Sequence, residues 1–107
     1  MFVKMYQYHI QEDKVDKYFQ IQEKASVVYS QYIESHTMYL NSKADNTRWI
    51  EITRYKDEKE YIESLKLINQ QEEIQKLFQS FQSLLLTGKE EIIEEDFEIY
   101  IKKGEWK

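Results

Sequence analysis

The chain has 107 residues, which is enough for one domain with a single core and too little for two, so we expect residues 1–107 to form one domain. It has no cysteine, which excludes disulfides, thiolate metal sites and a cysteine nucleophile. With a net charge of -5 and no basic stripe, the chain is a poor partner for nucleic acid and anionic membranes, and we expect neither nucleic acid nor a membrane as its partner. Because the chain starts directly with strand-like alternation and not with a leader sequence, we expect a cytoplasmic protein.

The first predicted elements are a strand, a helix and a second strand. Residues 2–10 are rich in aromatic residues and alternate in both phases, which predicts a central strand that is covered on both faces. Asp13 is a candidate cap for a long amphipathic helix that ends near Ile33. Residues 35–40 predict the second strand, and the polar residues 41–46 predict the turn after it.

The clearest strand covers residues 48–55, where apolar and polar positions alternate with a period of two. Ile50 and Ile52 fall on one face, and we expect this face to contact a dry core. The other face is aromatic and polar, which is typical of a strand that faces a cavity or a partner. It carries Trp49, Glu51, Thr53 and Tyr55.

The second half of the chain predicts two helical pieces and a last strand. Asp57, with a glutamate three residues later, is typical of a helix start. The apolar stripes on either side of residues 69–71 are out of phase, which predicts a break there, and Gly88 is a candidate C-terminal stop. We expect a solvated connection over residues 90–96 and a strand over residues 96–102.

The predicted order β-α-β-β-α-β is that of the split β-α-β, or ferredoxin-like, plan, in the α+β class. We expect a four-stranded antiparallel sheet with the first and third strands in the middle and the helices on one face. The residues expected to face the helices are Ile50, Ile52, Phe97, Ile99 and Ile101. The opposite face has no cover within the chain, and monomers seldom leave such an apolar patch open, so we expect a homodimer. The residues expected on that face are Trp49, Tyr55, Tyr100, Glu51 and Glu98.

The sequence resembles the dimeric α/β barrel superfamily, in its antibiotic biosynthesis monooxygenase-like branch. The resemblance covers nearly the whole chain, and it is carried by residues 6–10 and 14–18, residues 49–56, the capped helix, and residues 74–85. It implies homodimers that pair face to face and enclose a cavity between sheet and helices. Some members oxidise polycyclic phenols without metal or flavin, and some degrade haem.

The haem-degrading members use an asparagine, a tryptophan and an axial histidine. On this chain those positions fall near Gln7, near Tyr55 and within residues 75–83, where there is no histidine. A haem site without its proximal imidazole lacks the main iron ligand. Haem degradation is therefore disfavoured, and we expect no cofactor.

Two side chains are candidate catalytic bases. An imidazole side chain is the usual proton acceptor near neutral pH, so His9 is able to take the proton of a phenol. Glu51 lies among aromatic residues, and desolvation would raise its pKa. A structural role for His9, and an ion pair of Glu51 with Lys or Arg across a dimer, are the alternatives. The sequence shows no spaced set of His, Asp and Glu that predicts a metal site.

Four aromatic residues are candidate ligand contacts: Trp49, Tyr55, Tyr100 and Tyr39. They are able to stack on a flat ligand, and equally able to fill the core of a dimer. Three functions stay open at this point. The first is a barrel protein that binds a small aromatic or apolar ligand in an internal cavity. The second is a cofactor-independent monooxygenase of a phenolic substrate, and the third is a structural dimerisation module without ligand.

Overall fold

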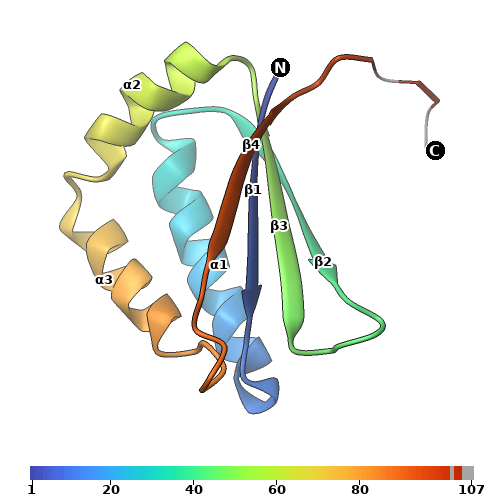
Figure 1. Ribbon diagram of the computed structural model, residues 1–107. Coiled ribbons are helices and arrows are strands. Elements are labelled where there is room, and N and C mark those ends of the chain that lie inside the picture. Colours follow the sequence, from blue (N-terminus) through green and yellow to red (C-terminus); the bar gives the residue numbers. More distant parts are fainter. Residues whose placement is uncertain (102, 105–107) are drawn as a thin grey trace.

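The computed structural model describes residues 1–101, 103 and 104. Their three α-helices lie on one face of a four-stranded antiparallel sheet (Figure 1). The strand order β2-β3-β1-β4 places the first and third strands in the middle, so the predicted α+β, ferredoxin-like plan is confirmed. The elements in chain order are β1 (Phe2–His9), the short 3-10 helix η1 (Glu12–Lys14), α1 (Val15–Ser30), β2 (Ser35–Asn41), β3 (Arg48–Tyr55), α2 (Glu58–Ile68), α3 (Glu72–Gln82) and β4 (Ile93–Glu98).

The starts of two helices differ in how they are capped. Helix α2 has the predicted cap, since Oδ1 of Asp57 accepts a 2.7 Å hydrogen bond from the backbone N–H of Glu60. The predicted cap of α1 is wrong. The chain first turns through η1, so Asp13 lies inside that turn and Lys14, which makes no side-chain capping bond, precedes α1.

The predicted break between two helical pieces is confirmed, because α2 ends at Ile68 and α3 begins at Glu72. Gly88 is not the stop of α3, which ends at Gln82. It lies in the turn before β4 with a φ of 88°, a conformation that glycine adopts without a steric penalty. The short loop between α2 and α3 lets the two helices follow different directions along the sheet (Figure 1).

The face of β3 that contacts the helices is the opposite of the predicted one. Trp49, Thr53 and Tyr55 are buried beneath the helices, while Ile50 and Ile52 lie on the other face. Aromatic side chains bury more surface than isoleucine, and here they pack against aromatic side chains of the helices. The ring centroids of Trp49 and Tyr18 are 5.1 Å apart, and those of Tyr55 and Tyr61 are 4.7 Å apart.

The uncovered face of the sheet is apolar, as predicted, but its residues are different. Cross-strand pairing places Ile52 between Met5 and Met38, and Ile50 next to Leu40. Met38 is 57% exposed and Leu40 is 42% exposed, so water reaches a continuous apolar surface. We call this surface the open face, and its apolar residues are Val3, Met5, Met38, Leu40, Ile50, Ile52, Ile93 and Phe97.

The last strand begins earlier than predicted, at Ile93, and part of the expected solvated connection belongs to it. The reason is Lys4, which is buried on the inward face of β1. Its Nζ lies 2.6 Å from Oε2 of Glu94 and 2.8 Å from Oδ1 of Asp96, so acidic residues that look solvated in the sequence hold β4 against β1. Phe97, which was expected to face the helices, consequently lies on the open face. Ile99 and Ile101, also expected to face the helices, come after the end of β4. Lys102, the last residue of the predicted strand, lies outside the described residues.

The core between the sheet and the helices has two parts. One surrounds Tyr8, Tyr18 and Phe81, and the other surrounds Phe2, Tyr55 and Ile68. Among the described residues, no helix is both long enough and apolar enough to cross a membrane.

Candidate functional site

A cavity of about 420 Å³ lies between the sheet and the helices. Its volume is within the range of small-molecule sites, which is roughly 300–1,000 Å³. Ser26 on α1, Gln75 on α3 and Asn69 in the loop between α2 and α3 belong to its wall and are exposed, which places its opening between these elements. Six of the nine tyrosines line it: Tyr6, Tyr8, Tyr29, Tyr39, Tyr55 and Tyr61.

The sheet side of the cavity follows from the register of its strands. Side chains alternate between the two faces of a strand, so residues paired across strands share a face. Tyr6 on β1 is opposite Glu51 on β3, and Glu51 is opposite Tyr39 on β2. This cross-strand row of two tyrosines and one carboxylate therefore lies together under the helices.

Glu51 is held by a chain of two buried tyrosines. The hydroxyl of Tyr8 donates a 2.8 Å hydrogen bond to Oε1 of Glu51, and it lies 2.7 Å from the hydroxyl of Tyr18. Tyr8 has a single hydroxyl proton, which it uses in the hydrogen bond to Glu51. Tyr18 is therefore the donor in the hydrogen bond between the two tyrosine hydroxyls. Tyr8 is 2% exposed and Tyr18 is fully buried, so this chain runs from the core to the cavity wall.

Burial raises the pKa of the Glu51 carboxyl above its usual range, although the hydrogen bond from Tyr8 acts in the opposite direction. Burial also raises the pKa of the tyrosines in the wall, to about 12 for Tyr29. For Tyr8 and Tyr39 the carboxylate of Glu51 adds to this effect. The tyrosines thus stay neutral, and Glu51 is the group in the wall that changes its charge in the ordinary pH range.

Lys4 lies beside the cavity but not in its wall. Its Nζ is 5.8 Å from the ring centroid of Tyr6 and 5.7 Å from that of Tyr61. Burial lowers the pKa of Lys4, but hydrogen bonds to Asp96 and Glu94 outweigh that effect and the pKa is raised. Lys4 therefore remains charged, and its charge is already neutralised.

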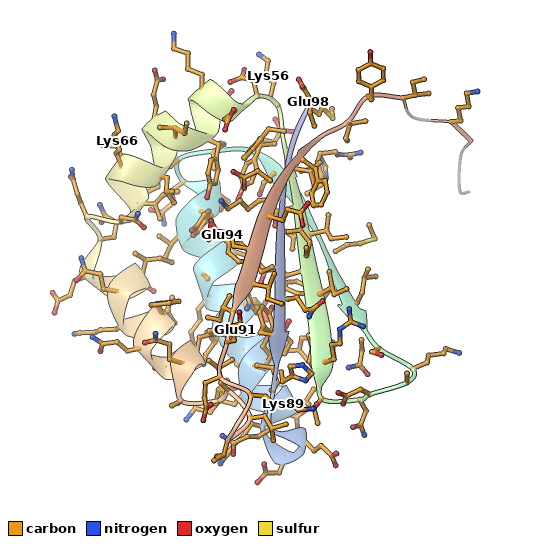
Figure 2. All side chains as sticks on the ribbon, viewed as in Figure 1. Lys56, Lys66, Lys89, Glu91, Glu94 and Glu98 are labelled. Atoms are coloured by element: carbon orange, nitrogen blue, oxygen red, sulfur yellow. The ribbon has the colours of Figure 1, made fainter. Side chains whose placement is uncertain are left out.

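Three other lysines lie away from the cavity. Figure 2 shows Lys56, Lys66 and Lys89 at the periphery of the molecule, and each is exposed. Glu94 lies on β4 on the side of the helices, in agreement with its ion pair to Lys4 (Figure 2). Among the described residues, no group of three or more His, Cys, Asp and Glu side chains is arranged to hold a metal ion.

The structure brings three of the predicted site residues together. Glu51, Tyr39 and Tyr55 line the cavity. Trp49 shares their face of β3 but packs against Tyr18 and Phe19 at the edge of the cavity and is not part of its wall.

The other two predicted site residues lie elsewhere. Tyr100 follows β4 and is 94% exposed. His9 is on the opposite side of the sheet from Glu51, where its Nδ1 is 3.0 Å from Oγ1 of Thr47 and 3.5 Å from Oδ2 of Asp45. The structure thus separates the two candidate bases, and the partner of Glu51 is Tyr8.

Four lining tyrosines, Tyr6, Tyr8, Tyr29 and Tyr61, are absent from the predicted site. For Tyr6 and Tyr8 the sequence indicates only that they share one face of a strand, because they are two residues apart. Tyr29 and Tyr61 lie on two helices far apart in the sequence, and their meeting depends on the tertiary fold.

Comparison with known proteins identifies solved structures that have a similar fold. No family model matches the sequence, and no curated protein matches it. An uncharacterized NIPSNAP domain protein from Burkholderia xenovorans superimposes with a TM-score of 0.75 at 14% identity, covering 98% of this chain and 100% of that one. SnoaB from Streptomyces nogalater, described as a cofactor-independent oxygenase, gives a TM-score of 0.74 at 8% identity, with 97% of each chain covered.

A putative antibiotic biosynthesis monooxygenase from Nitrosomonas europaea gives a TM-score of 0.68 at 13% identity, covering 94% of this chain and 100% of that one. This chain has the antibiotic biosynthesis monooxygenase-like fold. The resemblance that the sequence predicted is thereby confirmed for the fold. At these identities the antibiotic biosynthesis monooxygenase-like fold carries no activity with it, because one fold hosts many functions.

Proposed function

We propose that this protein binds a small aromatic or apolar molecule in the cavity between its sheet and its helices. The observation that carries this proposal is the cavity itself, about 420 Å³ in volume and lined by six tyrosines around Glu51. Protein cores are close-packed, with few voids larger than a water molecule. A purely structural dimerisation module has no need of such a cavity with a buried carboxylate in its wall.

We further propose that the working form is a homodimer formed through the open face. Ile52 lies there between Met5 and Met38 at the centre of the sheet, and none of the three helices covers that side. An exposed apolar surface of this kind marks an interaction site. A second copy, laid face to face, would remove these side chains from water.

Ligand binding is tested with 1-naphthol, followed by intrinsic fluorescence and by calorimetry. We expect saturable binding to the wild-type protein. Ala25 lines the cavity, so the Ala25→Leu variant should fill part of it and lose the binding. Ala44→Leu is the matched control, because Ala44 is exposed in the loop between β2 and β3. If 1-naphthol and similar apolar probes do not bind, the proposal is wrong.

A second candidate function is oxidation of a phenolic substrate by O₂ without a cofactor. It is favoured by Glu51, whose raised pKa and position in the wall suit a general base. The solved structure of SnoaB, described as a cofactor-independent oxygenase, has the same fold. With an anthrone-type substrate, Glu51 would accept a proton from the ring methylene, O₂ would convert that methylene to a ketone, and the second oxygen atom would leave as water.

Oxygen uptake with an anthrone or a quinol tests this second candidate. We expect uptake to be lost in Glu51→Gln and retained in His9→Ala, since His9 lies across the sheet from the cavity. Absence of uptake with the wild-type protein would count against oxidation while leaving ligand binding intact.

A further inference from the structure

Among the described residues, the wall of the cavity has one side chain that carries a formal charge when it is ionised, and this charge is negative. Among the described residues that line the cavity, Glu51 is the one acidic side chain, and no lysine, arginine or histidine is present. The rest of the wall consists of tyrosines, neutral polar residues and apolar residues. A ligand inside it therefore meets one carboxylate and no positive group.

One oxygen of this carboxylate is free to contact a ligand. Oε1 of Glu51 accepts the hydrogen bond from Tyr8, whereas Oε2 takes part in no hydrogen bond within the part of the chain that the structure describes. A buried carboxylate without a positive partner is costly, because water no longer solvates it. Within the described residues, the wall thus supplies no counter-charge for the ionised form of Glu51.

Lys4 does not supply this counter-charge. Its Nζ forms ion pairs with Glu94 at 2.6 Å and with Asp96 at 2.8 Å, so the three side chains together carry a net negative charge. Lys4 also shows how a cation sits here, since its Nζ lies within 6 Å of the ring centroids of Tyr6 and Tyr61. These are the distances at which a cation is attracted to the electron-rich face of an aromatic ring.

We propose that the ligand of this cavity is an organic cation, with a protonated amine or quaternary ammonium group on an apolar body. This inference rests on the proposed ligand-binding function and specifies its ligand class. Glu51 supplies the counter-charge, and the tyrosine rings supply cation–π attraction and apolar contact. An anion would lose its hydration next to Glu51 and gain no positive partner, so the cavity selects against carboxylates and phosphates.

Three probes of the same shape test the charge of the ligand. Phenyltrimethylammonium, tert-butylbenzene and benzenesulfonate each join a phenyl ring to a tetrahedral group, with charges of +1, 0 and -1. Their affinities are measured by displacement of 1-naphthol and by calorimetry. We expect phenyltrimethylammonium to bind at least about tenfold more tightly than tert-butylbenzene, and benzenesulfonate to bind most weakly.

Variants then test whether Glu51 is responsible for the preference for the cationic probe. In Glu51→Gln the side chain keeps its shape and loses its charge, so the preference for the cation over the neutral probe should fall by about tenfold. Glu63→Gln is the matched control, because Glu63 is an exposed residue of α2 outside the cavity wall, and it should keep the preference.

The outcomes distinguish this inference from the proposed function. If the wild-type protein binds the neutral probe as tightly as the cation, or if Glu51→Gln keeps the full preference, the inference is overturned and the ligand cavity stands. If 1-naphthol and all three probes fail to bind, both are overturned. The wild-type comparison depends on no variant, so poor folding of Glu51→Gln would not weaken it.

Discussion

The hydroxyl of Tyr8 donates a 2.8 Å hydrogen bond to the carboxylate of Glu51 across the two central strands of the sheet. Tyr8 is almost completely buried, and its hydroxyl also accepts a 2.7 Å hydrogen bond from the hydroxyl of Tyr18. The two tyrosines fix the position of Glu51 and leave its second oxygen toward the cavity. This arrangement links the stability of the core to the chemistry of the cavity wall.

Replacement of Tyr8 by Phe should destabilise the protein and raise the pKa of Glu51 further. The variant removes the donor that lowers the pKa of Glu51, and it leaves the buried Tyr18 hydroxyl without its acceptor. We expect a loss of about 1–3 kcal/mol in the free energy of unfolding, which chemical denaturation measures. A ¹³C NMR titration of the Glu51 carboxyl follows the pKa.

The matched control is Tyr100→Phe, because Tyr100 is 94% exposed, and its free energy of unfolding should change by no more than about 0.5 kcal/mol. Equal stability of Tyr8→Phe and Tyr100→Phe would show that the Tyr8–Glu51 bond does not hold the site.

Glu51 should make the protein less stable as the pH rises. Burial raises its pKa in the folded state, so between the pKa of the unfolded chain and the raised pKa the folded state binds more protons. The stabilising effect of the bound proton is complete at low pH and is lost as the pH rises through the folded pKa. The loss is about 1.4 kcal/mol for each unit by which the pKa is raised.

Glu51→Gln does not titrate at this position, so its stability relative to the wild type should increase from pH 4 upward and then level off above the pKa of Glu51. The tyrosines facing Glu51 stay neutral over this range, since burial raises their pKa values. Denaturation series at several pH values measure the difference, and Glu63→Gln on the surface should show none. A difference that does not change with pH would contradict a raised pKa.

The order and type of the elements could be predicted because they depend on local patterns. The alternation over residues 48–55 gives a strand with the same bounds as β3, and the capping pattern at Asp57 marks the start of α2. Alternation divides a strand into two faces but does not say which one is covered. Both faces of β3 are apolar enough to be buried, and the choice depends on the rings of Tyr18 and Tyr61, which lie on other elements.

For the candidate site, too, the sequence indicates which residues share a face of a strand, but not which face is covered. Glu51 and Tyr55 were predicted because they share a face of one strand, and both line the cavity. The first strand alternates in both phases, so its sequence does not indicate that Tyr6 and Tyr8 point inward. That choice depends on the helices, since the ring of Tyr8 packs against those of Tyr18 on α1 and Phe81 on α3.

A charge at the centre of the open face should separate the proposed homodimer. Ile52 lies on β3 between Met5 and Met38, and an Ile52→Glu substitution would place a carboxylate in the middle of the apolar surface. An unpaired charge in an interface core is strongly unfavourable, so we expect a monomer by light scattering at micromolar concentration.

Ile62→Glu is the matched control for this prediction, because Ile62 is exposed on α2, on the opposite side of the sheet from the open face. It should leave the dimer intact. A wild-type protein that scatters as a single chain would contradict the homodimer, and so would an Ile52→Glu variant that still dimerises.

Lys4 should hold the edge strand β4 in place. Its Nζ is the shared partner of Glu94 and Asp96, and its side chain is buried, with Nζ within 6 Å of the ring centroids of Tyr6 and Tyr61. Lys4→Met keeps most of the apolar stem and removes the charge. Since Glu94 and Asp96 are each about half exposed, water can solvate them in the variant, and we expect a moderate loss of about 2 kcal/mol in the free energy of unfolding.

Hydrogen exchange should localise this effect, because within the part of the chain that the structure describes β4 is an edge strand, paired with β1. In Lys4→Met the amides of β4 should exchange faster than those of β2, the other edge strand. Lys76→Met is the matched control: Lys76 forms a 3.1 Å ion pair with Glu72 on the exposed side of α3, and its loss should cost less than about 0.5 kcal/mol. Unchanged protection of β4 in Lys4→Met would show that backbone pairing with β1 is sufficient to hold the strand.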